Sequence, residues 1–230
     1  MVEAVKPKRS YRSSIREQHG RETRRVIIEA AKTVFEREGF AATSMKAIAA
    51  QAGVVTKTVY TAYSTKSGVL SAVWDVVLRG DEDAPSVGAL AWYREVLEEP
   101  APQKQLRLNA RNSRIVKMRI AGVVKVIRDG ATSDPGVGKL WGDIESSFFN
   151  NQLAVVESLH EKKALRPDLT VKQGADILWT LNHPDLWRLL VGERHWSPDA
   201  YEQWFGDTAC AQLLAPQAST ARKQSSKRAT

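Results

Sequence analysis

Apolar residues recur along this chain with the period of an α-helix, and no stretch of convincing length alternates with the period of a β-strand. The pattern is clearest in residues 26–35, where six apolar residues share one helical face: Val26, Ile27, Ala30, Ala31, Val34 and Phe35. The same period returns in successive segments to about residue 214. We therefore predict an all-α protein with about nine or ten helices.

Turn residues divide the first part of the chain. Gly39 is placed to cap the end of a first helix, and Thr43 is placed to cap the start of a second one. Gly53 permits a sharp turn before a third helix. The predicted helices span residues 21–39, 44–51, 56–63 and 66–79.

An acidic, turn-rich segment, "GDEDAPSVG" at residues 80–88, predicts a linker between two helical domains. The helical pattern resumes after it, with proline residues marking several breaks. The predicted helices there span residues 89–98, 103–129 (one helix or two), 135–162, 171–181, 184–191 and 198–214. We thus expect a basic flexible arm (1–20), a first domain (21–79), the linker, a second domain (89–214) and a basic disordered tail (215–230).

The charge of the chain is uneven. The formal net charge is +8, and the excess of Lys and Arg lies in the two ends, which leaves the middle near neutral. Basic ends on a near-neutral body favour contact with a polyanion, most simply nucleic acid, although a solvated tail is the simpler interpretation of the C-terminal end.

Other features exclude several kinds of site. The chain has one cysteine, Cys210, and four scattered histidines, so we expect neither a disulfide nor a metal site, and no cofactor. The N-terminus lacks the apolar core of a signal peptide, and no apolar run is long enough to span a membrane. We therefore expect a cytoplasmic protein without a membrane partner.

The two short helices on either side of Gly53 match the helix-turn-helix pattern, in which the second helix enters the major groove of DNA. Val59 and Tyr63, with Ala62, give the third helix a narrow apolar stripe that is sufficient to anchor it. Its remaining face carries hydroxyl groups and an ammonium group, which can bond phosphate oxygens and base edges.

At this point the chain resembles a known family. The combination of "FEREGF", "TS", "IAAQAGV" and "TVYTAYSTK" within residues 24–70 looks like the DNA-binding domain of the TetR family of transcriptional regulators. The stretches "GADILWTLNHPDLW" and "WSPDAYEQWFGDTACAQLL" are similar to the C-terminal helices of many members. The resemblance covers roughly residues 20–214.

The resemblance implies a set of DNA contacts. Thr43 and Tyr60 would touch phosphates, and Lys66 would clamp the backbone from the start of the fourth helix. Thr58 would touch DNA from the third helix, and the base readers would be Thr56, Lys57 and Thr61. Val55 stands where the family usually has Ser or Thr as the helix cap, which leaves two roles open for Thr56: capping the helix or contacting DNA.

The resemblance also implies a C-terminal domain that binds a small-molecule effector and forms a homodimer. Candidate effector-binding residues are Trp92, Tyr93, Arg119, Trp141, Phe148 and Trp179. The apolar residues expected at the dimer interface are Leu178, Leu181, Leu189, Trp204, Phe205, Ala209 and Leu213, with ordinary intrachain core as the alternative. A symmetric dimer would read a palindromic operator, because one recognition helix covers only a few base pairs.

The function implied is a repressor released by its effector. An activator, or a regulator that needs no ligand, remains open within the same fold. An enzyme is disfavoured, because "GVGKL" at residues 136–140 lacks the earlier glycine, the following Ser or Thr and the preceding strand of a phosphate loop. A helical scaffold or membrane-surface protein is disfavoured by the acidic residues on the polar face of the first helix.

Overall fold

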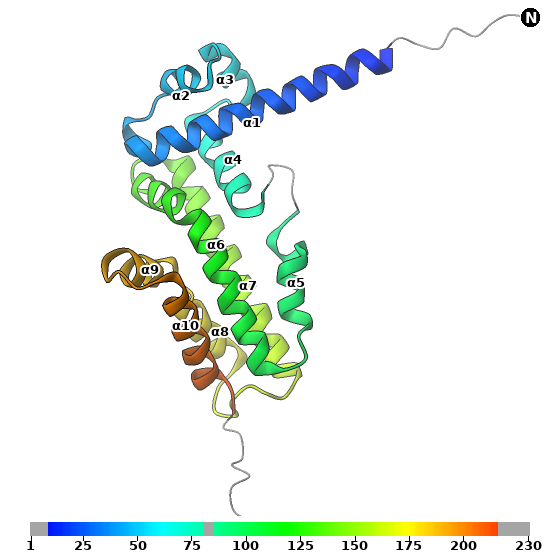
Figure 1. The fold of residues 1–230 in the computed structure, drawn as a ribbon, viewed down its shortest axis with the longest axis vertical. Coiled ribbons are helices and arrows are strands. Elements are labelled where there is room, and N and C mark those ends of the chain that lie inside the picture. Colours follow the sequence, from blue (N-terminus) through cyan, green and yellow to red (C-terminus); the bar gives the residue numbers. More distant parts are fainter. Residues whose placement is uncertain (1–8, 81–84, 216–230) are drawn as a thin grey trace, which may run out of the picture. The chain divides into compact units, whose positions relative to one another are not determined.

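The computed structural model of the protein describes residues 9–80 and 85–215, with side chains from Gln18 onward (Figure 1). Over these residues the chain is helical and forms no strand, and a single bridge pairs Leu165 with Leu214. The predicted all-α fold is therefore confirmed. None of the described helices combines the length and hydropathy needed to cross a bilayer.

The chain divides into two compact units. The N-terminal unit comprises the residues up to Ser86 together with Arg119–Glu145, and the C-terminal unit comprises Val87–Met118 together with the residues from Ser146. The predicted second domain covered residues 89–214, whereas residues 119–145 group with the first eighty residues. Two long helices, α6 (Pro102–Ala131) and α7 (Pro135–Glu161), consequently contribute to both units.

Four helices begin the N-terminal unit, and their bounds are α1 (Arg9–Ala42), α2 (Met45–Ala52), α3 (Thr56–Ala62) and α4 (Lys66–Arg79). The apolar face of α1 packs against α2 and α4, and α2 packs against α3. Ile27, Phe35 and Ile48 are completely buried between them. Burial of such side chains stabilises a fold by about 1.5–3 kcal/mol each, which fixes the otherwise marginal short helices α2 and α3 in place.

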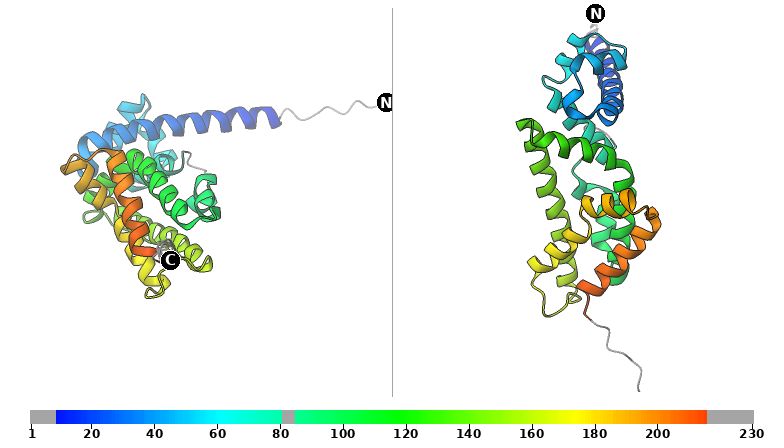
Figure 2. Two further views of the ribbon diagram at one scale, coloured as in Figure 1. Left: turned by 60° about the horizontal axis from the view of Figure 1, so that its bottom comes forward. Right: turned by 90° about the vertical axis from the view of Figure 1, so that its left-hand side faces the viewer.

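Helix α1 is longer than predicted at its N-terminus. A flexible arm was expected over residues 1–20, but α1 begins at Arg9 and extends beyond the other helices of its unit (Figures 1 and 2). No proline interrupts the sequence from residue 9 to residue 42, so nothing forces the helix to start later. Residues 1–8 and the tail from residue 216 lie outside the described residues.

Short side chains on α6 allow it to approach the end of α1 closely within the N-terminal unit. A Cβ atom at Gly130 would lie 3.0 Å from the Cβ of Phe40, and one at Gly122 would lie 2.5 Å from a carboxylate oxygen of Glu36. The two glycines are eight residues apart and share a helical face. They explain why residues 119–145 join this unit.

The C-terminal unit contains the 3₁₀ turn η1 (Val87–Ala89), α5 (Ala91–Glu98), the first part of α6, the last part of α7, α8 (Val171–Leu181), α9 (Pro184–Trp187), the π-helical segment η2 (Arg188–Glu193) and α10 (Pro198–Leu213). Gln105 on α6 donates to the hydroxyl of Ser158 on α7, and Asn109 donates to Gln152, so these two helices run antiparallel. Leu106, Val155, Leu178 and Phe205 are among the residues of a continuous apolar core.

Candidate DNA-binding site

The turn between α2 and α3 depends on a glycine. Gly53 has a φ of 66°, in the left-handed region, and its N–H bonds the carbonyls of Ala49 and Ala50 at the end of α2. Val55 stands at the N-cap position of α3 and is 70% exposed, although valine has no polar atom with which to cap a helix. Thr56 is the first helical residue and does not occupy the cap.

One side of α3 is anchored and the other faces solvent. Val59 is completely buried and Tyr63 is 8% exposed, whereas Tyr60 points away from this stripe and is 53% exposed. Lys57 and Thr61 are also exposed, and the Thr61 hydroxyl donates to the carbonyl of Lys57 at 2.8 Å. The narrow apolar stripe is therefore where the sequence predicted it, and the face of hydroxyl and ammonium groups is accessible.

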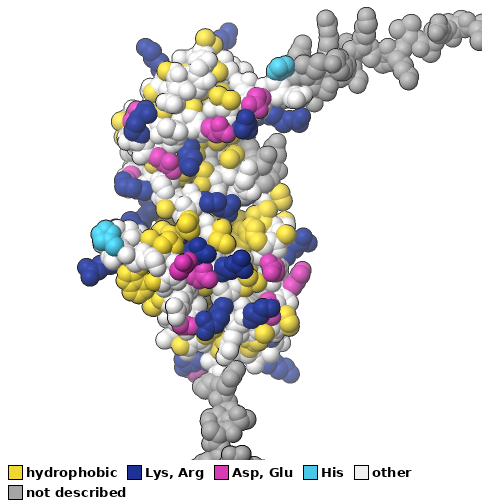
Figure 3. Space-filling view, viewed as in Figure 1, with side chains coloured by type: hydrophobic (Ala, Val, Ile, Leu, Met, Phe, Trp, Pro, Cys, Tyr) yellow, Lys and Arg dark blue, Asp and Glu magenta, His cyan; other side chains and the backbone are white. Residues whose placement is uncertain are grey.

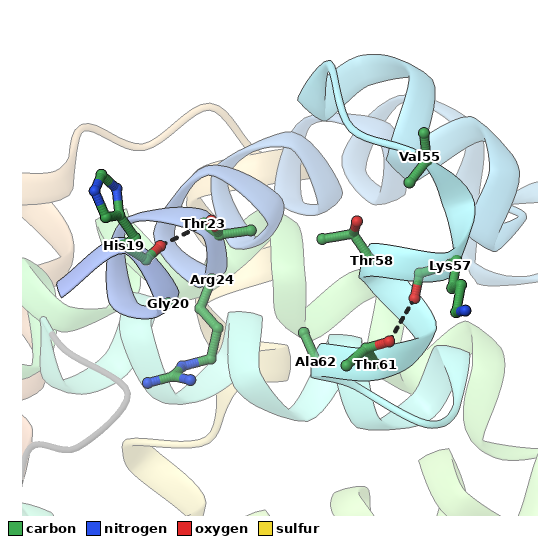
Figure 4. A pocket seen from close by; sticks show the side chains of 9 residues that line it. All are labelled: His19, Gly20, Thr23, Arg24, Val55, Lys57, Thr58, Thr61 and Ala62. Atoms are coloured by element: carbon green, nitrogen blue, oxygen red, sulfur yellow. Dashed lines mark hydrogen bonds between the residues drawn. The ribbon is translucent and has the colours of Figure 1, made fainter. Parts of the chain in front are cut away.

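An open groove of about 510 Å³ lies between α3 and the first half of α1 (Figure 4). Lys57, Thr58, Thr61 and Ala62 line one side together with Val55, and Arg24 and Thr23 face them from α1 with Gly20 and His19. None of the individual DNA-binding residues predicted from the sequence lies on α1, although the basic segment ahead of residue 26 favoured contact with nucleic acid. From residue 9 onward this segment has no proline that would keep it from being helical.

The structure corrects the prediction for Thr43. Its side chain is 2% exposed, and its hydroxyl donates to the carbonyl of Gly39 at 2.7 Å, so it is not available to a phosphate. Ser44 is the N-cap of α2 instead, and its hydroxyl accepts the N–H of Ala47. The neighbouring residue thus has the capping role assigned to Thr43.

The structure also corrects the prediction for Lys66. Its ammonium donates to the carbonyls of Phe40 at 2.7 Å and Thr43 at 2.8 Å, with a longer contact to Ala41 at 3.4 Å. It also lies 4.2 Å from the centre of the Phe40 ring. Burial lowers the pKa of Lys66, an effect that Asp134 opposes. Lys66 therefore caps free carbonyls at the end of α1, and its ammonium is directed toward its own chain.

The predicted effector-binding residues fall into both units. Arg119 and Trp141 belong to the N-terminal unit, where Arg119 contacts the carbonyl of Leu78 at 3.5 Å and Arg128 stacks on the Trp141 ring. Trp92 and Tyr93 lie on α5 in the C-terminal unit.

Tyr93 is a core residue. Its side chain is 5% exposed, and its hydroxyl donates to the carbonyl of Asn151 at 2.6 Å. Burial, with a contribution from Glu157, raises the pKa of Tyr93 to about 12.

Phe148 and Trp179 do lie in one cluster. The His183 ring lies 4.8 Å from the Trp179 ring and 6.5 Å from the Phe148 ring, centre to centre. Lys117, which the sequence analysis did not select, lies 5.9 Å from the centre of the Phe148 ring. No local signal in the sequence distinguishes Lys117, because Arg114 and Arg119 flank it on the same helix.

Four of the predicted interface residues are in the wrong place for that role. Leu178, Phe205, Ala209 and Leu213 are completely buried in the core of the C-terminal unit, where α8 and α10 pack together. The intrachain alternative is correct for them, because one apolar stripe on each helix is used within the unit. Of the others, Leu181 and Trp204 are half-buried and Leu189 is 38% exposed.

Comparison with known proteins agrees with this geometry. Residues 27–73, which include α2, α3 and the start of α4, match the family model described as "Bacterial regulatory proteins, tetR family". No curated protein sequence matches the chain. The match to regulatory proteins agrees with the prediction that the chain is not an enzyme.

Solved structures resemble the chain in fold. NalD, the secondary repressor of the MexAB-OprM multidrug efflux pump in Pseudomonas aeruginosa, is 18% identical with a TM-score of 0.63, over 86% of this chain and 98% of NalD. SmeT in complex with triclosan is 19% identical with a TM-score of 0.69, over 85% of this chain and 93% of SmeT; SmeT is the repressor of the multidrug efflux pump SmeDEF of Stenotrophomonas maltophilia. A TetR transcription regulator from Haloarcula marismortui is 16% identical with a TM-score of 0.64, over 84% of this chain and 99% of that regulator.

Proposed function

We propose that this chain, a transcriptional regulator whose residues 27–73 are a DNA-binding domain of the TetR family, is a repressor that binds a palindromic operator as a homodimer and is released by a small-molecule effector. The observation that carries the proposal is the outward polar face of α3, with Val59 anchored and Tyr60 exposed. A helix held in this way can enter a major groove without unfolding its own domain.

Lys57, Thr58 and Thr61 are the proposed base readers, because they line the groove side of α3. Tyr60 would bond a phosphate through its hydroxyl. Thr43 and Lys66 were expected to contact the DNA phosphates. We propose that Ser44 and the basic first half of α1 make these contacts instead, because both lie outside the buried core. Arg24 stands in the groove wall opposite α3 and would lie close to the same DNA backbone.

Dimerisation would use apolar side chains of the C-terminal unit that its own core leaves uncovered. On α6 these are Ile115 at 41% exposure and Met118 at 57%. Leu189 on η2 is 38% exposed, and Trp196, between η2 and α10, is 37% exposed. Arg114 ties α6 to α10 through Glu202, with an N–O distance of 2.5 Å. A second copy of the chain is the expected occupant, because a symmetric pair of α3 helices is what a palindrome requires.

Release by an effector is proposed by analogy with relatives such as SmeT, which binds triclosan in its complex. The unbroken helix α6 belongs to both units, so a ligand that shifts its first half would also act on its second half. Such a shift would change the spacing of the two α3 helices in a dimer.

The test is a mobility-shift titration of the full chain against duplex DNA from upstream of its own coding region, with a random duplex as control, at several salt concentrations. We expect tighter binding to the upstream duplex, a footprint with two-fold symmetry and a steep loss of affinity with salt. Equal affinity for both duplexes at every salt concentration would refute the proposal.

A further inference from the structure

Lys117 is a buried basic residue that no carboxylate pairs with in the part of the chain that the structure describes. It lies on α6 in the C-terminal unit, and its side chain is 4% exposed. Its ammonium donates to the amide oxygen of Asn182, and it lies 5.5 Å from the centre of the Tyr201 ring and 5.9 Å from that of Phe148. Among the described residues no carboxylate pairs with it, and burial alone lowers the pKa of Lys117 to about 7.

Such an arrangement is unfavourable for a charged ammonium group. A buried ammonium normally has a counter-charge or a full set of acceptors, because desolvation of an isolated charge costs several kcal/mol. Lys117 has three N–H donors and one acceptor, and two ring faces stabilise its charge only in part. Two N–H groups are therefore open to a ligand.

A second donor in the same aromatic cluster is also unsatisfied. The indole N–H of Trp179, on α8, is buried and has no acceptor among the described residues. Its ring packs on His183, which packs on Phe148, the ring beside Lys117. Buried N–H groups without a partner are rare in native proteins and call for an explanation.

The acceptors nearby are already used. The amide oxygen of Asn182 accepts from Lys117, and Nδ1 of His183 accepts the N–H of Asp185. The carbonyl of Leu181 accepts the hydroxyl of Tyr201, which uses that donor as well. The cluster thus offers donors and a positive charge, together with the partly exposed rings of Phe148 and Trp179.

We propose that this cluster is the effector site and that its ligand is a small organic acid, with the carboxylate on Lys117 and an apolar body against Phe148 and Trp179. The proposal rests on the proposed function, because it names the chemical class of the effector. A carboxylate supplies both the negative charge and the acceptors that the cluster lacks. A cationic ligand would meet an uncompensated ammonium.

The test compares ligands that differ only in charge, by isothermal titration calorimetry of the full chain. Octanoate and benzoate are the acids, octanol and benzamide the neutral counterparts, and benzylamine the cation. We expect the acids to bind at least about tenfold more tightly than the neutral compounds, which corresponds to about 1.4 kcal/mol, and the amine not to bind. No preference for the acids would overturn the proposal.

Three variants separate a ligand contact from a structural role. Lys117→Met should lower the affinity for the acids to that of the neutral compounds, and Trp179→Phe should weaken acid binding without loss of stability. Lys172→Met, which removes an exposed lysine paired with Asp176 on α8, is the matched control and should bind acids normally. If Lys117→Met lowers the melting temperature and the parent chain shows no acid preference, Lys117 is structural and the proposal fails.

The affinity for acids should also depend on pH. Carboxylates of this kind stay ionised above pH 6, whereas the fraction of protonated Lys117 falls as pH rises through about 7, so binding should weaken over that range. The other titratable groups at the cluster are Tyr201, His183 and Asp185, whose carboxylate oxygen lies 3.5 Å from Nδ1 of His183, and all three remain in Lys117→Met. That variant should therefore lose the decrease around pH 7, and a decrease that persists in it would assign the effect to another group.

Operator binding distinguishes failure of this inference from failure of the proposed function. If the acids do not bind and the chain still shifts its upstream duplex, only the inference fails. If it does not discriminate between duplexes, the proposed function fails as well. If octanoate binds and releases the duplex, both are supported.

Discussion

At the scale of single residues, Lys66 shows that a basic side chain beside a DNA-binding helix can form its hydrogen bonds within its own chain. Its ammonium meets carbonyls at the end of α1 and in the turn to α2. The sequence could indicate that Lys66 begins α4, but not that Phe40 and Thr43 lie within its reach. Thr43 was misassigned for the same reason, because its burial depends on packing and not on local pattern.

We expect Lys66→Met to destabilise the chain by about 1–3 kcal/mol, because buried carbonyls would lose a charged donor. Chemical denaturation of the full chain measures the effect. Lys46→Met, on the exposed side of α2, is the control and should change stability by less than about 0.5 kcal/mol. A Lys66 variant of unchanged stability with weakened binding to every duplex would return Lys66 to the role of a phosphate clamp.

We expect some residues of α3 to determine which bases are preferred and others to determine only the overall affinity for DNA. Lys57→Ala or Thr58→Ala should alter the preferred base at one operator position, with a change of about 1–3 kcal/mol there. Tyr60→Phe should weaken binding to all sequences about equally, because a phosphate contact carries no base information. Binding to a set of operators with single base-pair changes measures both effects, and a uniform loss in the first two variants would mean that another face of α3 reads the bases.

At the scale of elements, sequence reasoning succeeded where capping residues define a helix end. The predicted spans of α4 and α8 coincide with the observed ones, because Thr65 and Thr170 cap their first turns through side-chain hydrogen bonds. The start of α1 was missed, because the residues ahead of Val26 carry charge without an apolar stripe. The sharing of α6 was missed because it depends on Gly122 and Gly130 meeting α1, a long-range contact that local sequence does not encode.

The first half of α1 can be tested through Gly20. A Cβ at this position would meet nothing within 4 Å, so Gly20→Ala should fit and stabilise the helix by about 0.5–1 kcal/mol. Gly20→Pro should break α1 and lose helical signal by circular dichroism. If this half of α1 contacts DNA, the proline variant should also show a salt dependence reduced by about one unit of slope for each lost phosphate contact.

The Gly20 variants could also show that the first half of α1 makes no contact with DNA. Identical affinities and salt slopes for the parent chain and both Gly20 variants would confine the DNA contact to α2 and α3.

At the scale of the whole molecule, charge offers little guidance to the binding face. Lys and Arg side chains are interspersed with Asp and Glu on the face shown in Figure 3, which has no broad field of one sign. Many of the exposed charges are paired along one helix, such as Lys125 with Asp129 and Lys139 with Asp143. DNA recognition is therefore expected to depend on the local face of α3 and on two copies of it acting together.

Dimerisation is predicted to depend on Met118 and Leu189. Met118→Glu and Leu189→Glu should each shift the chain toward monomer in sedimentation experiments, because a charge placed in an apolar interface loses its hydration. Gln103→Glu is the control at the far end of the exposed side of α6 and should leave the assembly unchanged. If the unsubstituted chain sediments as a monomer, the proposal that a homodimer binds a palindromic operator is wrong.

The sharing of α6 and α7 has a practical consequence for anyone who would build chimaeras from this protein. The primary structure suggests a cut at the linker, but that cut would remove residues 119–145 from the surface of α1 and expose Phe40 to water. The DNA-binding helices therefore cannot be transferred to another protein by themselves. A functional chimaera would have to include the α6–α7 segment of residues 119–145, or a replacement with glycines at the positions of Gly122 and Gly130.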